Sequence, residues 1–159
     1  MHAHTLAKAG QRRSAIAETE RARALIAAGQ DADVPFWALA WGPPQGSVFS
    51  RTAKVFEALG DRANAAEQYA RAAACRPTAT YARIIALDLV AEGELHLSQG
   101  GIEQACATWT HAMDHMDGVA SARTRKAVTR MRRDLSRFWA RGLRCAIQLD
   151  ERAIALLRV

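Results

Sequence analysis

The chain has 159 residues and a formal net charge of +6, and half of its residues are hydrophobic. No run of about 18 apolar residues occurs, which excludes a membrane-spanning helix. The three cysteines are odd in number and widely spaced, which is typical of a reducing compartment rather than of a disulfide framework. Residues 1–10 lack the apolar centre of a signal peptide, so we expect a cytoplasmic protein.

The sequence predicts helices along almost the whole chain, because Ala, Arg and Glu favour helix while Gly and Pro fall between the periodic segments. Gly42, Pro43 and Pro44 predict a bend within an insertion over 29–46. About seven or eight helices are expected, over residues 1–8, 11–28, 47–59, 61–75, 81–99 and 102–116, from 121 onward and over 143–159.

One pattern occurs three times: a Gly, an Ala five residues later, a Thr or aromatic residue four further on, and a second Ala after three more. The glycines are Gly10, Gly60 and Gly100, the first alanines Ala15, Ala65 and Ala105, the middle residues Thr19, Tyr69 and Trp109, and the second alanines Ala22, Ala72 and Ala112. This is the spacing of the second helix of a tetratricopeptide repeat (TPR), and the chain resembles that family. The resemblance implies an all-α, TPR-like right-handed superhelix of helical hairpins; the alternative is an ordinary α-hairpin bundle.

In the TPR frame the chain is one helical domain over 1–159. It has a truncated first repeat (1–28), an insertion loop (29–46), a second repeat (47–77), a third repeat (78–118) and basic C-terminal helices (121–159). The front of the first repeat falls before Met1. We therefore expect either a piece of a larger protein or a broken terminal repeat, since terminal repeats need a cap. Gly93 occupies the small-residue position where two helices cross closely.

A narrower resemblance covers roughly residues 11–139. A last repeat followed by Ser121, Arg123 and a basic amphipathic helix is similar to the C-terminal sensor region of bacterial XRE-type helix-turn-helix transcriptional regulators. The DNA-binding domain of that family is absent from these residues. The resemblance implies a protein or peptide recognition module that serves as the sensor or interaction region of such a regulator.

The first helix of each hairpin lines the concave face of a TPR stack, which gives a candidate ligand or peptide groove. We expect basic residues such as Arg51 and Lys54 to take a carboxylate or an acidic peptide. The candidate groove residues are Arg51, Lys54, Glu57, Val90, Glu94 and Leu97.

Residues 121–144 contain nine Lys or Arg residues and a single acidic residue, Asp134. Such a helix is an alternative site of function, as a nucleic-acid-binding accessory surface or as a surface for an acidic partner protein. Its candidate residues are Arg125, Arg130, Arg132 and Arg133. Nucleic-acid binding is not expected without a further domain, because the interleaved aromatic residues are too few to stack bases. A homo-oligomer is also compatible with the sequence.

No enzyme and no cofactor are predicted, because the sequence contains no phosphate-binding loop, nucleophile elbow or CxxC motif. His111 and His115 are spaced i, i+4, which can chelate zinc. The sequence places no third or fourth ligand beside them, so no metal site is predicted.

Overall fold

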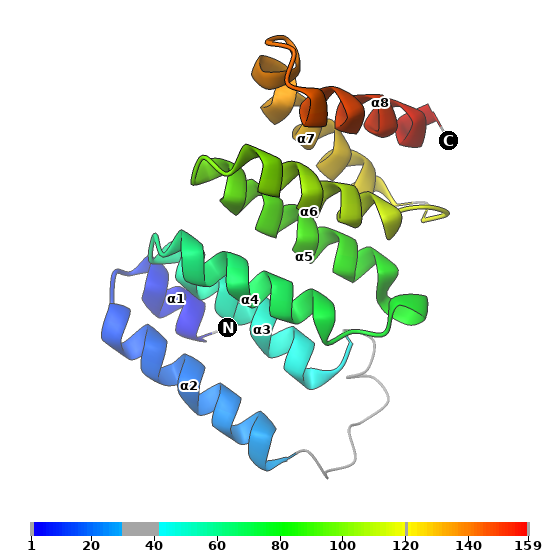
Figure 1. Ribbon diagram of the computed structural model, residues 1–159. Helices are drawn as coiled ribbons and strands as arrows, with labels where there is room; N and C mark the ends of the chain where they lie inside the picture. Colours follow the sequence, from blue (N-terminus) through cyan, green and yellow to red (C-terminus); the bar gives the residue numbers. More distant parts are fainter. Residues whose placement is uncertain (1, 30–41, 120, 159) are drawn as a thin grey trace. The chain divides into compact units, whose positions relative to one another are not determined.

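The computed structural model describes residues 2–29, 42–119 and 121–158 (Figure 1). These residues form helices and no strands, so the predicted all-α class is confirmed. The helices in the described ranges are α1 (His2–Lys8), α2 (Arg12–Ala28), α3 (Pro44–Ala58), α4 (Arg62–Ala74), α5 (Thr78–Ser98), α6 (Ile102–Asp114), α7 (Ala122–Trp139) and α8 (Arg144–Arg158).

The helices pack as two compact units, Met1–Arg76 and Pro77–Val159. In the first unit, α1 pairs with α2 and α3 with α4, and α3 contacts both helices of the preceding hairpin (Figure 1). In the second unit, α5 pairs with α6 and α7 with α8, while α7 packs on α5 and α8 on α6. Each unit is thus a stack of two antiparallel hairpins. The finer expectation of a TPR-like superhelix, and of one domain over 1–159, stays a prediction.

The repeated glycines form the turns inside the hairpins. Gly10, Gly60 and Gly100 have φ angles of 73°, 74° and 87°, which a residue without Cβ adopts at no steric cost. After Gly10 the amide of Gln11 donates to the carbonyl of Leu6 at 2.9 Å, the hydrogen bond of a Schellman helix end. The same bond recurs after Gly60 and Gly100.

A fourth turn of this kind stands between α7 and α8. Gly142 has φ 80°, and the amide of Leu143 donates to the carbonyl of Phe138 at 3.1 Å. The sequence pattern does not reveal this copy, because the residue five positions after Gly142 is Ile147 rather than Ala, and its side chain is exposed.

Small residues lie where the two helices of a hairpin meet. Ala15, Ala65 and Ala105 are fully buried, as their place in the repeated pattern predicts. Gly93 of α5 faces Trp109 of α6: a Cβ at Gly93 would lie 2.4 Å from Trp109 Nε1. The predicted close crossing at Gly93 is therefore confirmed.

The observed N-terminal ends of the helices agree only in part with those predicted from the sequence. Asp61 is the N-cap of α4 as predicted, and its carboxylate accepts a hydrogen bond from the amide of Asn64 at 3.3 Å. Ser121 is the N-cap of α7 but makes no side-chain capping bond. Helix α3 begins at Pro44, three residues earlier than expected, because Pro fits a first helical turn where its missing N–H costs nothing.

Within the described ranges, no helix combines the length and the apolar character that crossing a membrane requires.

Candidate functional site

The second unit carries a groove between α5 and α7, called here the α5–α7 groove. Its volume is about 420 Å³. Helix α5 contributes the residues of its last two turns, and α7 contributes one face, on which residues recur every three or four positions. The lining residues are Glu94, Leu97, Ser98, Arg130, Arg133, Asp134, Ser136 and Arg137.

Ion pairs cross and line this groove. Arg130 Nε lies 3.2 Å from Glu94 Oε1 and 3.7 Å from Asp134 Oδ2, so its guanidinium links α7 to α5. Arg133 Nε lies 3.2 Å from the other carboxylate oxygen of Asp134, and the guanidinium of Arg137 lies 4.7 Å above the ring of Phe138. The lining therefore holds three guanidinium groups against two carboxylates, an excess of positive charge.

The α5–α7 groove brings together two sets of residues that the sequence analysis treated separately. Glu94 and Leu97 come from the predicted peptide groove, while Arg130 and Arg133 come from the predicted basic surface. Val90 does not line it: its side chain is 5% exposed, and its carbonyl accepts a hydrogen bond from Trp109 Nε1 at 3.0 Å. Val90 thus belongs to the contact between α5 and α6.

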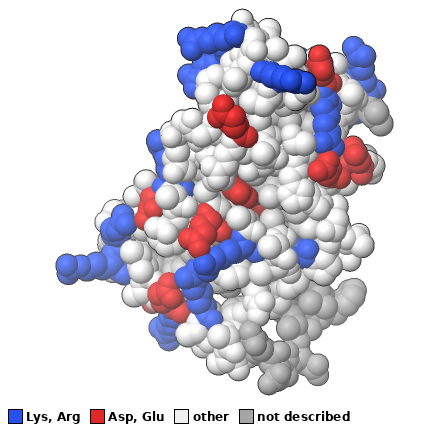
Figure 2. Space-filling view, viewed as in Figure 1, with Lys and Arg blue, Asp and Glu red and all other residues white. Residues whose placement is uncertain are grey.

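Some of the basic side chains of α7 are already bound to acidic residues of the same unit. Arg132 Nε donates to Asp150 Oδ1 of α8 at 2.7 Å, and this hydrogen bond raises the pKa of Arg132 further above its ordinary value. Arg125 is exposed and, within the described part of the chain, forms no ion pair. Figure 2 shows several Lys and Arg side chains at the α7–α8 end of the second unit, with acidic side chains among them.

Four polar residues of the groove were not predicted from the sequence: Ser98 of α5, and Asp134, Ser136 and Arg137 of α7. Asp134 and Arg137 lie four and seven positions after Arg130, so the helical period places all three on one side of α7. That signal was present in the sequence. The identity of the facing helix, α5, was not.

The other predicted groove residues lie in the first unit. Arg51 and Lys54 line a separate hollow of about 260 Å³ between α1, α2 and α3. Glu57 is not among its lining residues; its carboxylate accepts a hydrogen bond from Tyr69 Oη at 2.8 Å. The six predicted groove residues therefore fall in both units, and Glu57 and Val90 do not line the hollows described for their own units.

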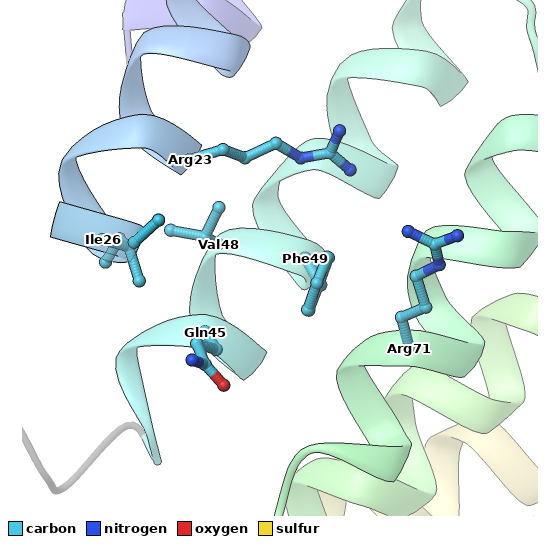
Figure 3. Close-up of a pocket in the computed structure, with 7 residues that line it drawn as sticks. Arg23, Ile26, Gln45, Val48, Phe49 and Arg71 are labelled. Carbon is cyan, nitrogen blue, oxygen red and sulfur yellow. The ribbon is translucent and has the colours of Figure 1, made fainter. Parts of the chain in front are cut away.

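A further groove of the first unit, about 420 Å³ in volume, lies between α2, α3 and α4 (Figure 3). The guanidinium groups of Arg23 and Arg71 extend toward the space beside Phe49, and Arg23 lies 5.8 Å from the centre of that ring. Both arginines are already engaged, Arg23 with Gln68 and Glu20 and Arg71 with Glu67. Neither arginine was among the predicted site residues.

Glu92 of α5 is a partly buried acid outside the α5–α7 groove. Burial raises its pKa above the ordinary value of 4.5, although the hydrogen bond to His96 and the charges of His96 and His111 act in the opposite direction. Glu92 Oε1 lies 3.3 Å from His96 Nε2, while Oε2 is buried and has no hydrogen-bond partner among the described residues.

The Glu92→Gln variant is expected to be more stable than the wild type at neutral pH, because the amide removes a buried negative charge. The folded state holds the Glu92 proton more tightly than the unfolded state. The wild type therefore loses stability as pH rises from 4.5 through the raised pKa, and the variant lacks that loss. Thermal unfolding of both proteins from about pH 4 to 8 measures this difference; a difference that does not change with pH would contradict the assignment.

Comparisons of the chain with protein-family models, curated proteins and solved structures gave no match.

Proposed function

We propose that the chain is a protein or peptide recognition module, and that it serves as the TPR-like sensor or interaction region of a bacterial helix-turn-helix regulator. The stacked hairpins and the glycine turns support this reading. The regulator setting rests on the resemblance of residues 11–139 to such sensor regions. The observation that carries the proposal is the α5–α7 groove, in which apolar, hydroxyl and guanidinium groups converge.

The chemistry of the groove favours an acidic peptide segment with a small apolar side chain. The excess of guanidinium groups attracts carboxylates, and planar guanidinium groups bind them through paired hydrogen bonds. Leu97 is the apolar residue of the lining. Ser136 Oγ donates to the carbonyl of Arg133 at 2.7 Å, which leaves the lone pairs of its oxygen available to a peptide N–H.

Binding in this groove would act on the packing of the unit. A ligand carboxylate competes with Glu94 and Asp134 for the guanidinium of Arg130, which is 56% exposed. Because the Arg130–Glu94 pair links α7 to α5, its replacement by a ligand changes how the two hairpins are joined. This is the proposed mechanism by which peptide binding is passed on to a partner domain.

The proposal is tested by charge reversal at the groove. The Arg133→Glu/Arg137→Glu variant is expected to weaken binding of acidic peptides at least tenfold, because two attractive charges become repulsive. The probe is an array of short peptides that combine Asp or Glu with one apolar residue, followed by fluorescence-polarisation titration of the best members at low and moderate salt.

The matched control is Arg123→Glu/Arg125→Glu, which changes the charge of the same helix by the same amount at exposed residues outside the groove lining. This control is expected to keep peptide affinity within about threefold, since exposed distant charges are screened. Equal losses in both variants, or a loss in neither, would overturn the groove assignment. Binding of duplex DNA or RNA that falls steeply with salt and is lost in both variants would instead support the nucleic-acid alternative.

A further inference from the structure

A pair of histidines lies at the C-terminal end of α6, and neither residue lines the α5–α7 groove. His111 is in the last turn of the helix and His115 is its C-cap. Their Nε2 atoms are 3.2 Å apart, and the ring centres are 4.9 Å apart. The i, i+4 spacing places both rings on one side of the helix, and the backbone of α6 holds their Cβ atoms at a fixed separation.

This separation matches that of two ligands on one metal ion. Imidazole nitrogens bind zinc at about 2.0–2.1 Å, so two nitrogens 3.2 Å apart subtend an angle of about 100–106° at the ion. The tetrahedral angle that zinc prefers is only slightly wider. No backbone movement is needed to bring the two Nε2 atoms into place.

We propose that His111 and His115 form a two-histidine chelating site for zinc, with the remaining coordination positions taken by water. Among the described residues, no group of three or more His, Cys, Asp or Glu side chains is arranged to hold a metal ion. The nearby carboxylate of Asp114 accepts a hydrogen bond from Arg152 of α8 at 2.5 Å. The site is therefore open, which distinguishes it from a closed four-ligand structural zinc site.

Both rings are accessible from solvent. His111 is exposed and His115 is half-buried, so an ion can reach the pair from solvent.

Zinc at this site joins the last turn of α6 to its C-cap. It therefore opposes fraying of the helix end and stabilises the folded state, because the ion binds the folded arrangement of the two rings better than the unfolded chain. Arg152 fastens the same helix end to α8 through Asp114 and through the carbonyl of Thr110 at 3.3 Å.

The test is isothermal titration of the full chain, without an affinity tag, with zinc chloride at about pH 7.5. The wild type is expected to bind one zinc ion per chain and to unfold at a higher temperature when zinc is present. His111→Ala and His115→Ala are each expected to weaken binding about tenfold or more, because each leaves a single imidazole and removes the chelate. His111→Gln and His115→Gln, which keep most of the side-chain volume, separate loss of a ligand from loss of packing.

Two controls address other histidines of the chain. His2→Ala/His4→Ala removes the N-terminal pair and His96→Ala removes the histidine of α5; both are expected to keep the wild-type affinity. Failure of the wild type to bind zinc saturably would overturn the proposal. Unchanged affinity in both the His111 and the His115 variants would also overturn it.

Discussion

Gly93→Ala is expected to destabilise the second unit by about 3 kcal/mol, the upper end of the cost of overpacking a core. The added Cβ would lie 2.4 Å from Nε1 and 2.5 Å from Cδ1 of Trp109, whose side chain is completely buried. The indole cannot move away without losing its hydrogen bond to the carbonyl of Val90. Ala favours helix over Gly by about 1 kcal/mol, which offsets only part of this cost.

Chemical denaturation followed by circular dichroism measures the change. Gly101→Ala is the matched control, because its new Cβ would meet its nearest neighbours at 3.5 Å, an ordinary contact. We expect that variant to stay within about 1 kcal/mol of the wild type. The Trp109→Leu substitution should destabilise the Gly93→Ala variant much less than it destabilises the wild type, because it removes the indole ring that meets the new Cβ. Strict additivity of the two changes would show that Gly93 and Trp109 do not meet as described.

Arg76→Ala is expected to destabilise the first unit by about 3 kcal/mol, because two hydrogen bonds from a buried charged group to backbone carbonyls are lost. Arg76 is 6% exposed. Its guanidinium donates to the carbonyl of Ala72 at 2.8 Å and to the carbonyl of Gly46 at 2.9 Å. It therefore holds the last turn of α4 against the first turn of α3.

The Arg76→Lys variant separates charge from geometry. An ammonium group cannot reproduce the planar fork of the guanidinium, so we expect this variant to recover less than half of the lost stability. Arg13→Ala, at an exposed position of α2, is the control and should change stability by no more than about 0.5 kcal/mol. Thermal unfolding of the variants measures these differences. An Arg76→Ala protein as stable as the control would contradict the role assigned to Arg76.

The sequence predicted the helices and most of their turns well, because both depend on neighbours along the chain. Gly10, Gly60 and Gly100 were recognised because each is followed by the same alanine spacing. Gly142 makes the same turn but was not recognised. In α8 the buried alanine is Ala146, four residues after the glycine, whereas the residue five positions after it, Ile147, is exposed. Gly93 was placed correctly, because only a residue without a side chain fits a close crossing of two helices.

The candidate site was predicted only in part. The excess of arginine on α7 was evident from composition, whereas Glu94 and Leu97 on α5 were placed in the candidate groove by the TPR frame that the resemblance implies. That these two sets line one groove was not evident, because the sequence does not state which face of α7 meets α5. Val90 was expected in the groove but is buried against Trp109, which shows how a small rotation of the expected helix face exchanges core and surface positions.

By itself, the sequence determined the helical class, the hairpin turns at the repeated glycines and the place where two helices cross closely. These follow from helical periodicity, from the need for a positive φ and from the absence of a Cβ. The tertiary structure alone decided which charges are paired. Arg130 and Arg132 stand two residues apart on α7, yet one meets Glu94 of α5 and the other meets Asp150 of α8. Residues two positions apart point to different sides of a helix, and only packing decides which helix lies on each side.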